Sequence, residues 1–190
     1  GLLHVIDSAS GRLRYNRSMT RTFNIDTPMT PAGTRFCPGT QGGANWNGPA
    51  FDPADNLLFT GEVDWCTRVR SESTDALAST PLGQLWTGSP DGFGKMDAVK
   101  MWGGWMTASD ADSGQRKWQV KTPFPLLGGI TPTAGGLLVF GDVGGNFYAY
   151  GAATGKKLWS HNLDGAIAGG VITYDAGAGQ RVAVAAGMTS

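Results

Sequence analysis

The sequence has little charge, few cysteines and no long apolar run. Of its 190 residues 16% are charged, the formal net charge is zero and only two residues are cysteine. The densest group of positive side chains is four arginines between Arg12 and Arg21, so nucleic acid is not an expected partner. No apolar run is long enough to cross a bilayer, and no transmembrane segment is predicted.

Motifs for metal or hydrolytic chemistry are also scarce. Cys37 and Cys66 lack paired histidines at ligand spacing, which gives a zinc site no support, and no Cys-x-x-Cys-His motif for c-type haem occurs. His4 and His161 have no serine and carboxylate at triad spacing. The segment GDVGGN, residues 141–146, joins two predicted strands without a following helix, so we interpret it as a turn rather than a phosphate loop.

Glycine and proline, in contrast, are abundant. Thirty glycines and ten prolines indicate frequent turns and few long surface helices, which favours an all-β fold. The length suits one domain with a substantial core or a piece of something larger. Because the chain begins within a strand-like run at residues 1–6 and ends just after another at residues 181–187, we interpret it as a fragment truncated at both ends.

Three hairpin-like segments share one spacing of residues. In residues 144–162, Ala149, Thr154 and Gly155 lie ten, five and four positions before Trp159. The spacing recurs at Ala108, Asp110, Ser113, Gly114 and Trp118, and at Val5, Asp7, Ser10, Gly11 and Tyr15. It predicts a strand, a tight turn capped by polar side chains, and a strand that carries a large flat side chain. A lone tryptophan would more simply be a core residue, but the recurrence, with 41 positions from Trp118 to Trp159, is typical of four-stranded propeller blades.

This pattern resembles the tryptophan-docking motif of the dehydrogenases that depend on pyrroloquinoline quinone (PQQ), in which eight blades close into a ring. The resemblance extends over residues 36–59, 131–159 and 165–187, which are similar to successive parts of the family's C-terminal half. It implies an incomplete β-propeller over residues 1–190, with about four blades of antiparallel four-stranded sheet.

The resemblance also implies how neighbouring blades are joined. In the family, the indole stacks near the glycine of the next blade and its N–H donates to a main-chain carbonyl, as a buried indole requires. We expect this of Trp118 and Trp159, with Gly11, Gly114 and Gly155 as the docking glycines. Tyr15 replaces the first tryptophan, and Gly151 stands where the other copies have Asp7 and Asp110, so these two joints are expected to be looser.

The two cysteines allow either a disulfide or two buried thiols. They lie 29 positions apart, beside turns or strand ends. The resemblance favours a bridge between Cys37 and Cys66, because several PQQ enzymes carry one at the corresponding place, and it implies a periplasmic location. Closing a loop of about 30 residues would stabilise the fold by roughly 3 kcal/mol.

The resemblance places cofactor contacts in two loops. In residues 42–53, Asn45 matches the asparagine that hydrogen-bonds the quinone oxygens, and Trp46 adds a flat surface; taken without the family, Asn45 and Asn47 would hold a turn and Trp46 would fill the core. An amide N–H directed at those oxygens would stabilise the negative charge of the reduced cofactor. In residues 123–136, Leu127 replaces a tryptophan that many members carry before paired glycines.

No catalytic or metal-binding residue is assigned to this chain. Glu62 and Asp64 alternate on a predicted strand and share a face, as paired-carboxylate catalysis would need, but a solvated face or contact with loop main chain is the favoured interpretation. In the family, the aspartate base and the ligands of the calcium or lanthanide ion lie upstream of the matched part.

The resemblance implies hydride transfer from an alcohol or a sugar to PQQ, with a cytochrome c or a quinone as electron acceptor. The fragment alone is expected to be inactive and to bind PQQ weakly. The alternative is a non-enzymatic propeller scaffold that binds proteins in the cell envelope; the segment Cys37–Pro53, which a scaffold blade does not need, argues for the enzyme. Residues 71–97 are polar and rich in Gly and Pro, and predict a surface insertion between blades with a helical turn at Thr74–Ala78.

Overall fold

The computed structural model describes residues 1–177 and 179–187, and its regular structure is almost entirely antiparallel β-sheet. Two sheets have four strands each. The first contains β4 (Ala50–Asp52), β5 (Leu57–Val63), β8 (Gly104–Asp110) and β9 (Arg116–Thr122), and the second contains β10 (Ile130–Pro132), β11 (Leu137–Gly141), β12 (Asn146–Gly151) and β13 (Lys157–Asn162). Within each sheet the strands lie side by side in the order in which they occur along the chain, with β6 (Thr67–Val69) and β7 (Lys95–Met96) inserted between β5 and β8. This order is the topology of a propeller blade.

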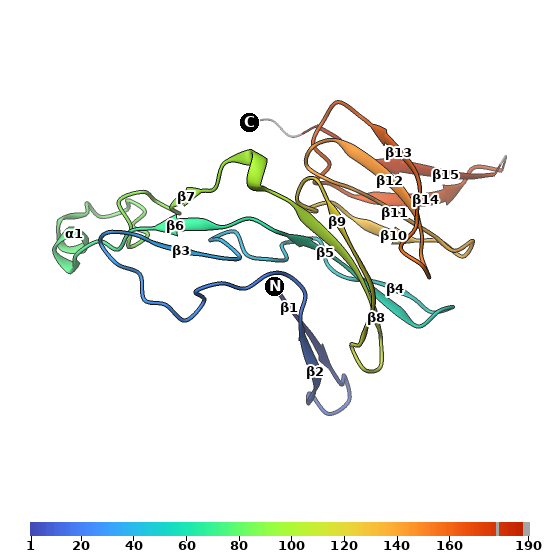
Figure 1. Cartoon of the computed structure of the whole chain (residues 1–190), viewed down its shortest axis with the longest axis horizontal. Helices are drawn as coiled ribbons and strands as arrows, with labels where there is room; N and C mark the ends of the chain where they lie inside the picture. The colour runs from blue at the N-terminus through green and yellow to red at the C-terminus, as the bar shows by residue number, and fades with distance from the viewer. Residues whose placement is uncertain (178, 188–190) are drawn as a thin grey trace.

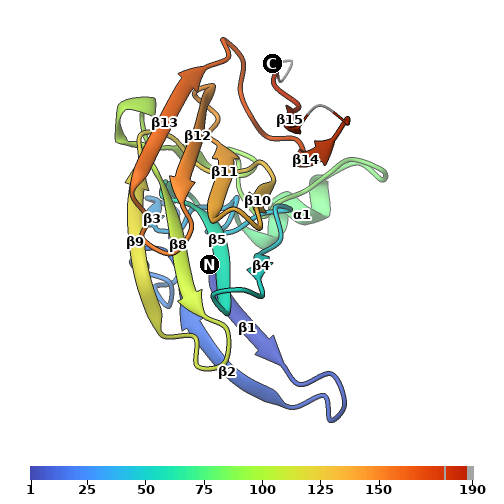
Figure 2. The same ribbon diagram turned by 90° about the vertical axis from the view of Figure 1, so that its right-hand side faces the viewer.

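Two further sheets of two strands flank these blades. One pairs β1 (Leu2–Ile6) with β2 (Leu13–Ser18), and the other pairs β14 (Val171–Asp175) with β15 (Gln180–Val184). The sheets follow one another like the blades of a fan (Figure 2). Strand β10 contacts both β4 and β14, so the first strands of three successive sheets lie side by side. The predicted all-β partial propeller is confirmed: four blades are represented, two with four strands and two with two strands each.

The hairpin turns explain why Asp, Ser and Gly recur at fixed spacing. In the turn between β8 and β9, Asp110 Oδ1 accepts hydrogen bonds from the main-chain N and the hydroxyl of Ser113, at 2.9 and 2.8 Å. Gly114 closes the turn at φ +68°, a left-handed conformation that suits glycine. Asp7 and Ser10 make the same two bonds between β1 and β2. The two hydrogen bonds from Ser113 hold the pKa of Asp110 below its usual value.

Trp118 joins the two four-stranded blades. A Cβ atom at Gly155 would lie 2.7 Å from the indole ring, so this position has room for glycine alone, and the indole Nε1–H donates to the carbonyl oxygen of Ala152 at 2.9 Å. Tyr15 packs in the same way on Gly114 of the next blade, and its hydroxyl donates to Ala111 O at 2.7 Å. The tyrosine therefore reproduces both contacts through a different donor.

Trp159 and Gly11 lie at the two ends of this series. Trp159 is 50% exposed, with its ring stacked on His161 and edge-on to Phe147. A Cβ atom at Gly11 would meet nothing within 4 Å. A docking role for these two residues stays a prediction.

Apolar side chains between adjacent sheets form the main core. The largest cluster lies between the two four-stranded blades, where Phe59 and Met106 of one meet Leu138 and Phe140 of the other. A second cluster, which includes Val139, Phe147, Ile167 and Val171, packs β14 against the blade before it. Adjacent sheets thus bury apolar side chains between them, which is the physical reason that such repeats stack.

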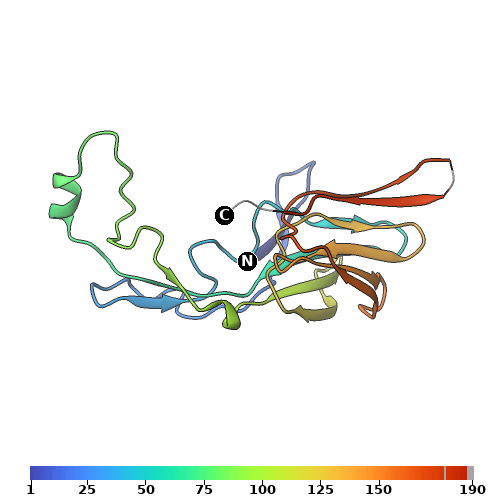
Figure 3. The ribbon, with the colours of Figure 1, turned by 90° about the horizontal axis from the view of Figure 1, so that it is seen from above.

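An arm extends from the first four-stranded blade; it combines the segment between β5 and β8 with β3, which precedes β4. Its base is a three-stranded sheet of β3 (Thr34–Phe36), β6 (Thr67–Val69) and β7 (Lys95–Met96), followed on the chain by a 3₁₀ helix at Val99–Met101. Helix α1 (Thr74–Ser79) has no buried residue and lies at the far end of the arm, away from the blades (Figures 1 and 3). The helical turn falls where the sequence predicts it; the status of residues 71–97 as an insertion stays a prediction.

Candidate functional site

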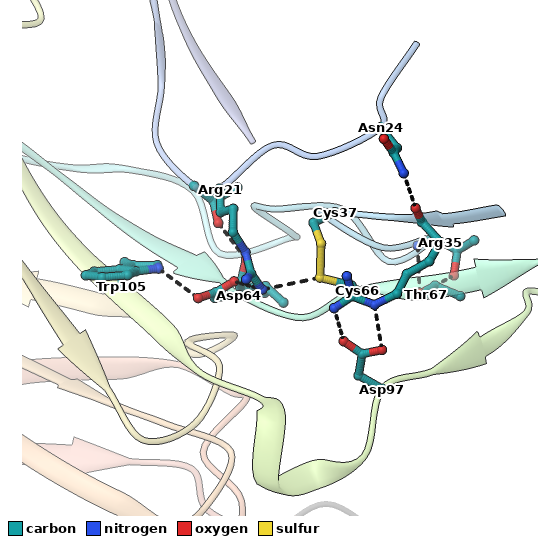
Figure 4. Close-up of a disulfide and its surroundings, with 12 residues drawn as sticks. Arg21, Asn24, Arg35, Cys37, Asp64, Cys66, Thr67, Asp97 and Trp105 are labelled. Atoms are coloured by element: carbon teal, nitrogen blue, oxygen red, sulfur yellow. Dashed lines mark hydrogen bonds and ion pairs between the residues drawn. A yellow bond between two sulfur atoms is a disulfide. The ribbon is translucent and has the colours of Figure 1, made fainter. Parts of the chain in front are cut away.

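A disulfide fixes the loop that carries the predicted cofactor contacts. Cys37 and Cys66 are bonded, with an S–S distance of 1.97 Å (Figure 4). The bridge joins the end of β3 to the residue after Trp65, and two main-chain bonds reinforce it: Gly39 N donates to Trp65 O at 3.1 Å, and Val63 N donates to Gly43 O at 2.9 Å. Residues 37–43 therefore run along the end of β5.

Ion pairs surround the disulfide (Figure 4). Arg21 Nη2 lies 2.9 Å from Asp64 Oδ1 and 3.3 Å from the sulfur of Cys66. Arg35 forms a two-pronged pair with Asp97, at 2.5 and 3.1 Å, which lowers the pKa of the Asp97 carboxyl. Because bidentate arginine pairs are geometrically specific, they hold β3 against the segment that follows β7.

Glycines shape the loop at residues 42–48. Gly42 has φ +77°, and a Cβ atom at Gly43 would clash with the Thr20 side chain and the Gly1 main chain. The amide of Asn47 donates to the carbonyl oxygens of Gly61 and Leu126, at 3.2 and 3.1 Å. Asn47 therefore holds the turn, the role that its residue type suggested without any resemblance.

Asn45 has a different environment. Its Nδ2 is buried and has no hydrogen-bond partner among the residues that the structure describes. Asn45 borders a cavity of 520 Å³ together with Gln41, Trp46 and Phe93. An unpaired buried donor costs free energy, which makes Asn45 a candidate for contact with a ligand.

Trp46 and Gln41 line both this cavity and a second one of 320 Å³. The second cavity is lined by Trp46, Trp65, Trp102, Leu127 and Val143, among others. Trp46 is 70% exposed, and its Nε1 makes only a long contact, 3.4 Å, with Ala168 O. The alternative that Trp46 fills the core is therefore wrong, because nothing covers most of its ring.

Leu127 is almost fully buried, at 5% exposure, among Val63 and Trp65. The glycines after it bring the loop close to the next sheet, where Gly129 N donates to Gly169 O at 2.8 Å. The structure thus brings Asn45, Trp46 and Leu127 to two adjoining cavities. Their contact with a cofactor stays a prediction.

These residues fit a flat ligand rich in acceptor oxygens. The unpaired amide donor of Asn45, the exposed face of Trp46 and the aliphatic side chain of Leu127 offer the hydrogen-bond and packing contacts that PQQ would need. Within residues 1–177 and 179–187, no group of three His, Cys, Asp or Glu side chains is arranged to hold a metal ion.

The favoured interpretation of Glu62 and Asp64 as a solvated face is wrong. Glu62 is fully buried, and its carboxyl accepts hydrogen bonds from the hydroxyls of Thr60 and Thr107, at 2.5 and 3.1 Å. Asp64 is 7% exposed and is paired with Arg21 and with Lys121, the latter at 3.8 Å. Glu62 accepts from Thr60 of β5 itself and from Thr107 of β8, where β5 is a central strand with covered faces. Asp64 follows β5 and pairs with Arg21, which lies after β2, and with Lys121 of β9.

Burial raises the pKa of Glu62 well above its usual value, and the hydrogen bonds from Thr60 and Thr107 offset part of that rise. The two carboxyl groups do not form a catalytic pair, since each is engaged by its own set of partners.

Several cavity residues were not singled out from the sequence. Trp65 and Trp102 meet edge to face, with ring centroids 5.0 Å apart, and Trp102 Nε1 donates to Asp97 O at 2.8 Å. In the sequence, Trp65 was noted only as the residue before Cys66, so nothing indicated that it lines a cavity. Met96 and Phe93 come from the predicted surface excursion, so no local signal placed them at a cavity.

Comparisons with known proteins agree with the blade architecture. A family model described as outer membrane protein assembly factor BamB matches residues 103–188. A solved structure of a quinohemoprotein alcohol dehydrogenase from Comamonas testosteroni superposes with a TM-score of 0.78 at 22% identity, over 98% of this chain and 30% of that chain. At this identity the superposition shows the fold alone.

Sequence relatives define the class more closely. Lupanine 17-hydroxylase (cytochrome c) of a Pseudomonas species is 33% identical over 150 residues, which are 79% of this chain and 20% of that protein. The lanthanide-dependent methanol dehydrogenase of Methylacidiphilum fumariolicum is 31% identical over 143 residues, or 73% of this chain and 22% of that protein. The comparisons confirm that this chain resembles part of the PQQ-dependent dehydrogenases. It spans between 20% and 33% of the length of the curated relatives.

Proposed function

We propose that this chain forms part of the propeller wall and of the PQQ pocket of a dehydrogenase that oxidises alcohols or sugars. When bound, PQQ would accept a hydride from the substrate carbon. The residues of this chain would position it: the Asn45 amide would donate to a quinone oxygen, and Trp46 and Leu127 would pack against the ring. The observation that carries the proposal is the buried, unpaired Asn45 Nδ2 at a cavity.

The rest of the reaction is proposed from the relatives. A calcium or lanthanide ion would polarise the cofactor, and its ligands and the catalytic base would come from outside the matched segment. A cytochrome c or a quinone would accept the electrons. We also propose a periplasmic location, which the Cys37–Cys66 disulfide supports because such bonds persist in oxidising compartments. The described part of the chain has no helix long and apolar enough to span a membrane.

Dye-linked activity of the full-length protein, reconstituted with PQQ and either calcium or a lanthanide, tests this function across alcohols and aldoses. We expect Asn45→Ala to weaken PQQ binding by about tenfold, since it removes one hydrogen bond to a charged or strongly polar oxygen. Asn16→Ala, on the exposed side of β2, is the matched control and should leave binding unchanged. Absence of PQQ-dependent activity with every metal and substrate would contradict the proposal.

The second candidate is a non-enzymatic scaffold that binds proteins, which the match of residues 103–188 to the BamB family model supports. That match covers blade repeats and leaves out the disulfide loop with Asn45 and Trp46. The upstream coding sequence separates the two: a Glu, Asn and Asp metal set favours the enzyme, and plain repeats back to a lipoprotein signal favour the scaffold.

A further inference from the structure

Two groups of basic side chains meet where the sheet of β1 and β2 packs on the first four-stranded blade. One is the run of four arginines between Arg12 and Arg21, on and around β2, and the other is the pair Arg116 and Lys117 at the start of β9. Both strands lie at an edge of their sheets, and neither contains an aspartate or a glutamate. The proposed cofactor contacts use none of these residues.

Arg17 reaches across this joint. Its Nη2 donates to the carbonyl oxygen of Ser113, in the turn before β9, at 2.8 Å. Its guanidinium also lies over the ring of Tyr15, 5.3 Å from the centroid. These two contacts hold the positive charge of β2 beside the blade that carries Arg116.

Arg116 is held by a chain of hydrogen bonds on the facing blade. Its Nη1 donates to Gln119 Oε1 at 2.6 Å. The amide nitrogen of Gln119 in turn donates to Met19 O and to Thr107 Oγ1, at 3.1 and 2.9 Å. Because both ends of the Gln119 amide are engaged, its oxygen keeps a fixed direction and orients the guanidinium. A group that is already oriented loses less conformational entropy when it binds a ligand.

Two cavities, of 330 and 310 Å³, lie at this joint. Ser18, Met19 and Arg116 line both, Arg21 contributes to the first and Arg17 to the second. No aspartate or glutamate lines either cavity. Arg21 is paired with a carboxylate, whereas Arg17 and Arg116 form no ion pair within residues 1–177 and 179–187. Two positive charges without a counter-ion therefore border the same cavity.

This arrangement suits an anion with several oxygens. A guanidinium has five N–H donors and no acceptor, and the bond to Gln119 uses one donor of Arg116. Two like charges near one another repel, and a doubly charged anion between them turns that repulsion into attraction. The planar fork of arginine matches the geometry of phosphate oxygens.

We propose that the cavities between β2 and β9 bind a phosphate group, with Arg17 and Arg116 as its two cationic ligands. The group comes from inorganic phosphate or from the head group of an anionic phospholipid, which present the same oxygens. The site belongs to this joint and is not a feature of the repeat, because Val120 stands two positions after Trp118, where Arg17 stands two positions after Tyr15. It does not depend on the proposed dehydrogenase function.

Inorganic phosphate is the first probe. The whole isotope-labelled chain is titrated with phosphate at constant ionic strength, and the main-chain amide resonances of Gly114 and Gln115, which line the second cavity, are followed. We expect saturable shifts. Arg116→Gln should raise the Kd about 10-fold or more, the effect of one lost hydrogen bond to a charged group. Because Arg116 is exposed, this variant should keep the urea midpoint of the unaltered chain.

Arg14→Gln is the matched control. Arg14 lies on β2, is exposed and lines neither cavity, so this variant loses the same charge without losing a ligand. Its Kd should stay within about twofold of the parent value, because a distant exposed charge is screened by salt. A loss equal to that of Arg116→Gln would overturn the proposal, since diffuse attraction to positive side chains would then explain the binding.

Vesicles of phosphatidylcholine that contain phosphatidic acid are the second probe, with pure phosphatidylcholine vesicles as the reference, and sedimentation of the chain is the readout. Shifts with inorganic phosphate that depend on Arg116 support a site for free phosphate. Sedimentation with the acidic vesicles that depends on Arg116, without shifts by free phosphate, supports a site for a lipid head group. The proposal is overturned if neither probe binds.

Discussion

At the scale of single residues, buried polar side chains fall into two groups. Asp64 and Glu62 have partners that account for their burial. Four side-chain atoms are buried without a partner in the described structure: Asn45 Nδ2, Asn47 Oδ1, Trp65 Nε1 and Ser109 Oγ. Of these residues, Asn45 and Trp65 border cavities. The packing of the blades explains the first group, and the place of Asn45 beside a cavity supports the proposed contact with a ligand.

Glu62 predicts a pH dependence of stability. Its pKa in the folded protein is raised by burial above the ordinary 4.5, so its contribution to stability is fully present below that ordinary value and is lost as pH rises through the higher folded value. We therefore expect Glu62→Gln to flatten the decline in stability above about pH 4.5. Urea midpoints measured across pH test this.

Asp55→Asn, in an exposed turn between β4 and β5, is the control for removing one negative charge. It should keep the pH profile of the unaltered chain. An identical decline for Glu62→Gln and the unaltered chain would show that Glu62 does not titrate in this range.

At the scale of elements, the joints between blades depend on one aromatic side chain each. Trp118→Phe keeps the ring over Gly155 and removes the donor to Ala152 O. Leaving a carbonyl without its partner should lower the free energy of unfolding by about 1–3 kcal/mol. The measurement is chemical denaturation.

Trp159→Phe makes the same substitution on the next blade, where the side chain is half exposed. It should change stability by less than about 0.5 kcal/mol. Equal losses for the two variants would mean that the indole bond of Trp118 is not what stabilises the joint.

The disulfide is the other joint at this scale. It connects the end of β3 to the start of β6 and closes a loop with a sequence separation of 29, so replacing Cys37 and Cys66 together by serine should cost roughly 3 kcal/mol. Thermal unfolding of the double variant, compared with the oxidised and reduced parent, measures this. If the reduced parent and the variant unfold like the oxidised parent, the bridge does not contribute.

At the scale of the whole molecule, we expect this chain alone to bind PQQ weakly. The cavities at Asn45 and Leu127 offer contacts from one side of the proposed pocket, and the chain spans only 20–33% of its curated relatives, so contacts from the remaining blades are missing. Titration of PQQ into the chain, followed by absorbance, tests this against the full-length protein. A dissociation constant in the micromolar range or tighter would contradict it.

The hairpin turns and the contacts between blades could be predicted because they depend on residues close together in the sequence. The Asp, Ser and Gly turn recurs because each hairpin needs the same capping bonds and the same left-handed residue, and the flat side chain recurs because each blade must meet the next. Tyr15 fits the pattern despite its different chemistry, since a phenol also supplies a ring and a donor. The prediction that Glu62 lies on a solvated face was wrong, because alternation along a strand shows which residues share a face and does not show whether that face is covered.

The sequence by itself determined the blade repeat and the positions of the turns, because these follow from spacing within one hairpin, whereas the loop that contains Asn45 was indicated only by the family resemblance. Only the tertiary structure decided which buried groups have partners. Trp65 lies between β5 and β6, Leu127 lies between β9 and β10, and Met96 lies in β7 of the arm. Their convergence on one cavity depends on how the sheets stack and how the disulfide holds the loop. Contacts between residues so far apart in the chain leave no local pattern, since each is selected by the packing of distant elements.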